Sequence, residues 1–145
     1  MPANCRFAMA LHVLAVVAHD GEGATSEKIA GSVNTNPVTI RRLLGALRKA
    51  KIIVTQKGAG LGSRLTRPPG RITLAEVYRA VESGETFLFP GSRPNAKCPV
   101  GAHIQGALQS AFARAQSAME DELKTRTLDD LLPRIRRGKN ARQKV

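Results

Sequence analysis

The chain has 145 residues, of which 42% are hydrophobic and only 3% aromatic, and its formal net charge is +12. This length and apolar content suffice for one domain with a real core, so the composition excludes a disordered protein. The scarcity of aromatic rings disfavours single-strand binding by base stacking. Two cysteines exclude a disulfide framework, and no apolar run reaches the roughly 18 residues of a membrane span. No signal peptide is recognisable, so we expect a cytoplasmic protein without membrane contact.

Positive charge is concentrated in two segments of the chain. Residues 26–71 hold ten Lys or Arg and one acid, Glu27, while residues 134–145 hold six basic residues and no acid. Clustered positive charge is typical of a protein that binds a polyanion, and the first segment therefore indicates nucleic acid. For the basic tail, nucleic-acid binding and simple solubility are equally good interpretations.

In chain order, apolar spacing first predicts a helix over residues 5–18, which Asp20, Gly21 and Gly23 end. A short helix follows. Ser26 is its expected cap, because a hydroxyl at this point can accept from unpaired backbone N–H groups.

A tight turn and a basic helix come next. Asn34-Thr35-Asn36 forms the turn, Asn36 caps the helix, and Pro37 occupies its first position, where a missing N–H costs nothing. The expected buried stripe of this helix consists of Ile40, Leu43, Leu44 and Leu47.

Two short strands complete the first half of the chain. They are predicted over residues 52–56 and 64–67 and are joined by a loop that contains Gly58, Gly60 and Gly62. A helix, a turn, a basic helix and a basic hairpin in this order are typical of a winged helix-turn-helix. Double-stranded DNA is therefore the first partner to consider.

The second half is predicted to be mainly helical. Thr73 and Glu76 form a capping box before a further helix. Residues 86–89 are either a short strand or an extended link. A long helix is expected over residues 99–124, and Thr127 is expected to cap a short helical turn that a following proline limits.

The predicted fold is thus mainly α with a small β wing: a winged helix-turn-helix domain plus a long dimerisation helix. We expect the DNA-binding domain over residues 1–83 and a linking loop over 84–98. The dimerisation helix and a C-terminal helix take residues 99–137, and a disordered basic tail takes residues 138–145.

The helix that begins at Pro37 is the expected reader of base sequence, since a recognition helix contacts base edges with its N-terminal residues. Arg41 and Arg42 can pair bidentately with guanine, or they bind only phosphates. Ser26 marks a phosphate site or is a plain cap, and Lys57 enters a minor groove or is a solvated turn residue. The predicted DNA-binding residues are Ser26, Thr35, Asn36, Val38, Thr39, Arg41, Arg42, Thr55, Lys57 and Arg64.

Catalytic and metal-binding patterns are not recognisable. His12, His19 and His103 share no metal-ligand spacing with one another or with a cysteine. The glycine-rich loop lacks the Lys-Ser/Thr and helix that a phosphate-binding loop needs. We therefore expect no enzyme activity, no metal site and no cofactor.

Cys98 is the candidate sensor residue. It precedes Pro99 and the start of the long helix, where a helix N-terminus stabilises thiolate, and Lys97 adds positive charge. A redox or electrophile sensor is one interpretation, and an unreactive loop cysteine is the other. Cys5, in an apolar helix start, is less suggestive.

The motifs RFAMALHVL, SVNTNPVTIRRLLGALRKAKII, ITLAEVYRAVE, CPVG and TLDDLL, together with the glycine-rich wing, resemble the Rrf2 family of bacterial winged-helix regulators. They span nearly the whole chain in the expected order. The resemblance implies a homodimer whose long helix is the dimerisation element, and operator binding through the turn helix and the wing. The expected dimer interface residues are Ile104, Leu108, Phe112, Ala115 and Met119.

Two features, one in the loop before the long helix and one in the wing, depart from the family pattern. Cluster-binding relatives carry three closely spaced cysteines before the long helix, and this chain has only Cys98 there. The resemblance therefore implies the branch without an iron–sulfur cluster. Leu61 and Ser63 stand in the wing where relatives often have glycine and an aromatic residue.

The favoured interpretation is a dimeric, sequence-specific transcriptional repressor that binds a palindromic operator and responds to redox or electrophile signals through a thiol. The alternative is a basic nucleic-acid-binding protein without operator specificity. The two differ in how strongly binding depends on base sequence, because an operator-specific protein prefers its site by about 10³-fold or more.

Overall fold

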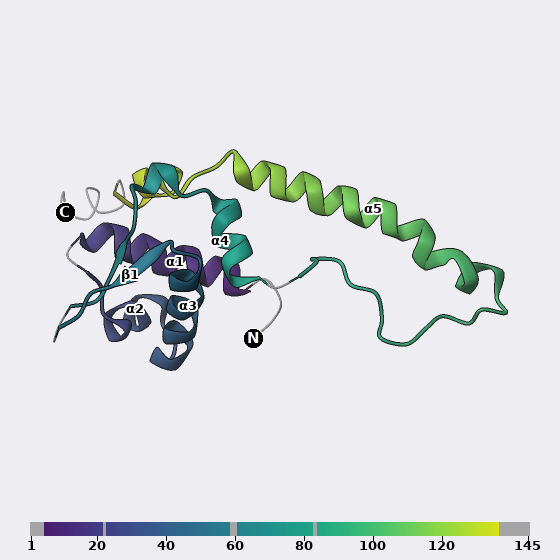
Figure 1. The fold of residues 1–145 in the computed structure, drawn as a ribbon, viewed down its shortest axis with the longest axis horizontal. Helices are drawn as coiled ribbons and strands as arrows, with labels where there is room; N and C mark the ends of the chain where they lie inside the picture. Colours follow the sequence, from purple (N-terminus) through teal and green to yellow (C-terminus); the bar gives the residue numbers. More distant parts are fainter. Residues whose placement is uncertain (1–4, 22, 59–60, 83, 137–145) are drawn as a thin grey trace, which may run out of the picture. The chain divides into compact units, whose positions relative to one another are not determined.

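The computed structural model describes residues 5–21, 23–58, 61–82 and 84–136. Its chain forms two compact units, one of residues 1–83 with 123–145 and one of residues 84–122 (Figure 1). Part of the wing loop and the predicted basic tail lie outside the described residues.

The first unit begins with three helices, α1 (Cys5–Asp20), α2 (Ser26–Val33) and α3 (Pro37–Lys49). The N-cap of α2 is Thr25, whose hydroxyl accepts from the backbone N–H of Lys28 at 3.2 Å, so the prediction that Ser26 caps this helix is wrong. Two adjacent hydroxyl residues both suit an N-cap, and the extended backbone of Thr25 decides between them.

The turn between α2 and α3 follows the prediction. Asn34 ends α2 in the left-handed conformation, at φ 61°, which asparagine tolerates better than most residues. Asn36 caps α3 by accepting from the backbone N–H of Val38 at 2.8 Å, and Pro37 occupies the first helical turn. The start of the candidate recognition helix is therefore fixed by its own local sequence.

The wing is a two-stranded antiparallel sheet of β1 (Ile53–Thr55) and β2 (Ser63–Leu65), in which Ile53 pairs with Leu65 and Thr55 with Ser63. Both strands are shorter than predicted. Ser63 also exchanges backbone hydrogen bonds with Ala24, at 3.0 and 3.2 Å, and this bridge attaches the wing to the segment before α2.

Gly62 is required by this attachment. A Cβ atom built at Gly62 would lie 2.1 Å from the carbonyl oxygen of Ala24, closer than any real contact. Since the obstacle is backbone, neighbouring side chains cannot move aside to relieve the clash.

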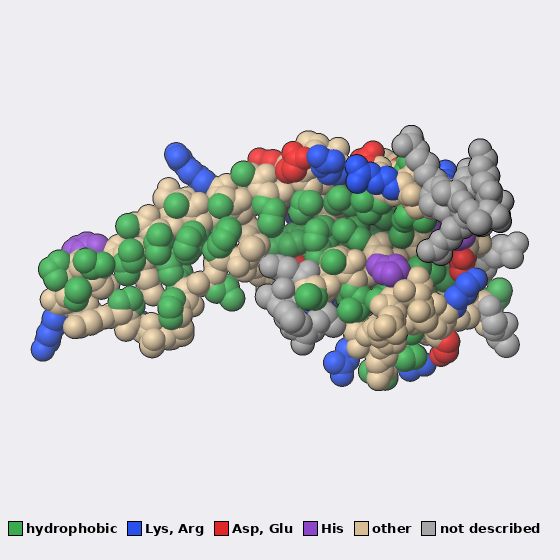
Figure 2. All heavy atoms as spheres, turned by 180° about the vertical axis from the view of Figure 1, so that it is seen from behind, with side chains coloured by type: hydrophobic (Ala, Val, Ile, Leu, Met, Phe, Trp, Pro, Cys, Tyr) green, Lys and Arg blue, Asp and Glu red, His purple; other side chains and the backbone are tan. Residues whose placement is uncertain are grey.

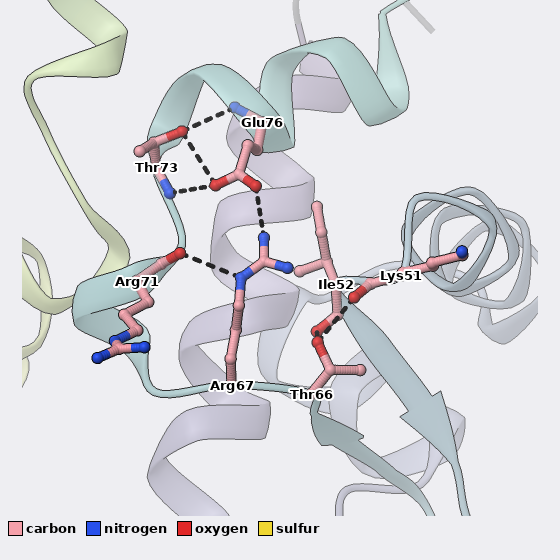
Figure 3. Close-up of polar contacts among 7 residues, drawn as sticks. All are labelled: Lys51, Ile52, Thr66, Arg67, Arg71, Thr73 and Glu76. Atoms are coloured by element: carbon pink, nitrogen blue, oxygen red, sulfur yellow. Dashed lines mark hydrogen bonds and ion pairs between the residues drawn. The ribbon is translucent and has the colours of Figure 1, made fainter.

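A polar network joins the end of the wing to the next helix, α4 (Leu74–Val81) (Figure 3). Thr73 and Glu76 form the predicted capping box. The Arg67 guanidinium donates to Glu76 and, through Nε, to the carbonyl of Arg71 at 3.1 Å. Thr66 donates to the backbone carbonyls of Lys51 and Ile52. The Arg67 side chain therefore connects the end of the wing to the capping box of α4.

One apolar core joins these elements. It contains buried side chains from α1 to α4, from the strand region and from the segment after α5 (Pro99–Lys124). The core residues with no exposed surface are Ala10, Val13, Leu14, Ile29, Ile40, Leu47, Ile72, Val77 and Leu128.

The segment after α5 packs in this first unit. Leu128 begins a short 3-10 turn, Leu128–Asp130, and its N–H donates to the carbonyl of Ile72 at 2.9 Å. At the start of this turn, the backbone N–H of Thr127 donates to the carboxylate of Asp130 at 2.8 Å. The predicted domain division grouped this segment with the long helix, whereas its leucines belong to the core of the winged domain.

The second unit consists of the segment 84–98, which we call the strap, and most of α5. Helix α5 has the predicted bounds and 26 residues, none of them buried. The strap is extended and holds no strand among its residues, so the interpretation of 86–89 as a link is the right one. A Cβ on Gly101 would lie 2.4 Å from the carbonyl of Asn95, which shows how closely the strap approaches the first turn of α5.

We predict that Gly62→Ala lowers the free energy of unfolding by about 1–3 kcal/mol, because the new Cβ displaces the Ala24 backbone. Gly31→Ala is the matched control, since Gly31 lies in α2 and a Cβ there meets nothing within 4 Å. Urea unfolding followed by circular dichroism measures both. Equal stability of the Gly62 variant and the parent would contradict the close contact.

Candidate nucleic-acid interface

Helix α3 has one buried and one exposed face. Ile40, Leu43, Leu44 and Leu47 are buried in the core, as predicted. The opposite side presents Val38, which is 49% exposed, and the exposed Arg41, Arg42 and Arg48. The apolar stripe therefore fixes which side chains of α3 can meet another molecule.

Arg41 lies in a groove between the start of α2, α3 and the wing. The groove has a volume of about 450 Å³ and brings together three of the predicted residues, Ser26, Arg41 and Thr55. Arg48 also lines it and donates to the hydroxyl of Thr55 at 2.8 Å. A helix N-terminus beside two guanidinium groups is suited to anionic oxygens.

Arg42 faces a different hollow. It lines a cavity of about 420 Å³ with Arg6, Thr39 and Val81. Consecutive helical residues lie about 100° apart around the axis, so Arg41 and Arg42 point to different sides of α3. The predicted DNA-binding residues of α3 thus form two groups, with Arg41 in one cavity and Thr39 and Arg42 in the other.

The remaining predicted residues are spread over the turn and the wing. Asn36 uses its side-chain oxygen to cap α3, and Thr35 is half-exposed in the turn. Arg64 is exposed on β2, opposite Val54, and Lys57 is exposed at the end of the described part of the wing loop. Ser63, a departure from the family pattern, is buried and pairs with Ala24.

Sequence reasoning missed two members of the α2–α3–wing groove, Arg48 and Glu27. Arg48 follows Arg41 by seven residues, which returns a side chain to the same helix face, so the helical period could have found it. Glu27 is brought to the groove by tertiary packing. Its carboxylate accepts from Arg41 at 3.0 Å.

Glu27 is ionised at neutral pH. A hydrogen bond from its own backbone N–H, then the Arg41 guanidinium, lower the pKa of its carboxyl below the ordinary value. The groove therefore holds a fixed negative charge at the point where a phosphate would approach Arg41. This charge disfavours an anion unless Arg41 gains compensating contacts.

We predict that Glu27→Gln raises the affinity for random-sequence duplex DNA by about two- to fivefold at low salt, because one repulsive charge is removed. Asp129→Asn is the control, since Asp129 is an exposed acid away from α3. Fluorescence anisotropy with a labelled random duplex measures the effect. An increase of the same size in both variants would mean that only net charge matters.

Cys98 is exposed in the second unit and directly precedes α5. Its N–H donates to the carbonyl of Asn95 at 3.1 Å, which holds the residue at the helix start. Backbone N–H groups of Gly101, and then of Val100, hydrogen-bond the sulfur and lower the pKa of the thiol. The helix start is thus the cause of the shift, whereas the predicted contribution of Lys97 is not among the causes.

We predict that Cys98 reacts with iodoacetamide at a lower pH than an ordinary thiol, because more thiolate is present at neutral pH. The Cys5→Ser variant leaves Cys98 as the chain's only cysteine. The pH midpoint of its alkylation rate should rise when the protein is unfolded in guanidinium. Identical midpoints in the folded and unfolded states would show that the helix start has no influence.

Comparison with known proteins decides the family. Residues 3–134 match the Rrf2 family model, described as an iron-dependent transcriptional regulator. The chain belongs to the Rrf2 family.

Two relatives are similar over nearly their whole length. YwnA of Bacillus subtilis (strain 168), named as an HTH-type transcriptional regulator, is 45% identical over 129 residues, which cover 89% of this chain and 96% of YwnA. A crystal structure described as that of a DNA-binding protein is 42% identical, with a TM-score of 0.71 and coverage of 88% and 98% of the two chains.

More distant Rrf2 proteins share the fold. The structure of CymR, the global cysteine regulator of B. subtilis, superposes with a TM-score of 0.67 at 21% identity and covers 92% of this chain and 97% of CymR. This likeness supports a winged-helix fold with a long C-terminal helix.

The residues of this Rrf2 chain do not fit an iron site built within one chain. Among the described residues, no three His, Cys, Asp or Glu side chains come together in a way that could hold a metal ion. Cys98 is the single thiol of the strap, and an iron–sulfur cluster takes four ligands. Separately, none of the helices in the described part has the length and apolar content needed to cross a bilayer.

Proposed function

We propose that this Rrf2-family protein is a dimeric, sequence-specific DNA-binding transcriptional repressor that acts in the cytoplasm. The observation that carries the proposal is the exposed basic side of α3, of which Arg41 and Arg48 share one groove with the α2 start and the wing. This arrangement matches the docking of a helix-turn-helix, in which the second helix enters the major groove and the wing follows the backbone.

Two kinds of contact are assigned to α3. Arg42 and Val38 project from the exposed side near its N-terminus, and they are the proposed contacts with base edges. Arg41 and Arg48, beside Ser26 and Thr55, are the proposed phosphate contacts of the groove. Thr35, Thr39, Lys57 and Arg64 supply further contacts from the turn, α3 and the wing.

Dimerisation is proposed through one face of α5. An uncovered apolar row recurs every three or four residues along the helix, and all its members are exposed in the single chain. Its members are Val100, Ile104, Ala107, Ala111, Ala115 and Ala118, which we call the seam. Such a row is the pattern that pairs two helices, and small residues let them approach closely.

The seam changes part of the expected dimer interface. Ile104 and Ala115 lie on it. Phe112 instead stacks on Phe87 of the same strap, and the Met119 sulfur accepts from the hydroxyl of Thr86 at 3.9 Å. We therefore assign Phe112 and Met119 to the strap side of α5, with Leu108 between the two sides.

We predict that Ala111→Glu dissociates the dimer, because it places a charge in the centre of an apolar seam. Ser110→Glu introduces the same charge one residue away, off the seam, and should stay dimeric. Sedimentation equilibrium at micromolar protein measures the mass of each variant. A monomeric parent protein would contradict the proposal directly.

Operator specificity is tested by selecting fragments of the source genome that the purified protein retains. We expect a palindromic site, because two-fold protein symmetry is matched by two-fold sequence symmetry. On the selected site, Arg42→Ala should cost about 1–3 kcal/mol of binding free energy. Binding that depends on salt but not on sequence would favour the alternative, a basic nucleic-acid-binding protein without operator specificity.

Cys98 is the proposed sensor of oxidants or electrophiles, on the strength of its exposure and its lowered thiol pKa. Operator binding is measured before and after diamide treatment. The parent and the Cys5→Ser variant should release DNA, whereas Cys98→Ser should retain it. Release by the Cys98→Ser variant would remove the role from this residue.

A further inference from the structure

Three of the four phenylalanines, Phe87, Phe89 and Phe112, form a cluster in the second unit, and only Phe7 packs elsewhere. Phe7 packs edge-to-face on Tyr78, at 5.4 Å between ring centroids, within the first unit. In the second unit, Phe87 and Phe89 of the strap pack on Phe112 of α5, with centroids 5.2 and 5.5 Å apart. Phe87 remains 42% exposed. A chain with so few aromatic residues thus places most of them in one partly open cluster.

The three rings line a groove of about 490 Å³ between the strap and α5. Two carboxylates, those of Glu85 and Glu120, also line it, and no Lys or Arg is among the described lining residues. This acidic lining is unusual in a protein with a net charge of +12. The volume lies in the range of small-molecule sites.

Hydrogen bonds position one of these carboxylates and tie the strap to the helix. The side-chain oxygen of Gln116 accepts from the backbone N–H of Thr86 at 3.0 Å. The amide nitrogen of Gln116 donates to Glu120 at 3.3 Å. The walls of the groove and the direction of Glu120 are therefore set within one chain.

The groove lies on the opposite side of α5 from the seam. Gln109, Phe112, Gln116 and Glu120 line the groove, whereas Ala107, Ala111 and Ala118 belong to the seam. Residues two positions apart on a helix, such as Gln109 and Ala111, are separated by about 200° around its axis. Figure 2 shows hydrophobic side chains, in green, along the part of the molecule that holds the strap and α5. A partner helix on the seam would leave the groove open.

We propose that this groove binds a small organic cation, an ammonium group carrying an aromatic or alkyl body. The faces of aromatic rings attract cations, and the two carboxylates supply opposite charge. The apolar body of the ligand would cover the exposed part of Phe87. The proposal stands independently of DNA binding, because every residue of the site lies in the strap and α5.

Benzyltrimethylammonium is the probe, with benzyl alcohol and phenylacetate as neutral and anionic comparisons, and calorimetric titration of the full-length protein is the measurement. We expect the cation to bind and the other two to bind at least about tenfold more weakly. The double variant Glu85→Gln, Glu120→Gln should weaken cation binding by about five- to tenfold. Phe87→Leu, which keeps an apolar side chain at an exposed position, should weaken it by about threefold.

Two variants serve as controls. Glu122→Gln removes a carboxylate from the same helix, two residues beyond Glu120, and should bind the probe like the parent. Ala111→Glu, on the seam, should also retain binding, because the groove forms within one chain. Absence of binding, equal binding of benzyl alcohol, or full affinity in the Gln double variant would each overturn the proposal. So would loss of binding in Ala111→Glu with the helical content unchanged.

Discussion

The geometry of the candidate interface depends on the burial of one side of α3. Because Ile40, Leu43, Leu44 and Leu47 are committed to the core, the helix cannot rotate without exposing apolar surface. Rotation by one residue would expose side chains worth about 1.5–3 kcal/mol each when buried. The directions of Arg41 and Arg42 are therefore consequences of the packing behind them. The wing completes the groove around Arg41. Because Gly62 has no side chain, the backbone of the wing can pack directly against the backbone of Ala24.

The elements with strong local signals could be predicted from the sequence. Pro37 and Asn36 mark the start of α3, and Thr73 with Glu76 marks the start of α4, because capping uses residues adjacent in the chain. Local signals do not decide between two adjacent residues that are both suited to the same capping position. Thr25 and Ser26 are both good caps, and only the backbone conformation selects the first.

Features that depend on tertiary packing could not be predicted. The pairing of Glu27 with Arg41 joins two helices, and nothing in the spacing of these residues indicates it. The helical period predicts a single apolar stripe on α5, because a period alone does not say which neighbour covers which side. The strap supplies that information, since Phe87 and Phe89 occupy the side that carries Phe112 and leave the seam uncovered. One amphipathic pattern thus resolves into two apolar sides with different surroundings.

The return of the chain after α5 makes the winged domain discontinuous in sequence. Leu128 and Leu132 are buried, and the backbone of Thr127 bridges to Thr73 beside the α4 cap. The domain is therefore built from two separate stretches of the sequence, and residues 84–122 are inserted between them. A fragment ending at residue 83 would lack two core leucines, each worth about 2–5 kcal/mol of stability in a packed core. Residues synthesised after the entire long helix accordingly contribute to the stability of the winged domain.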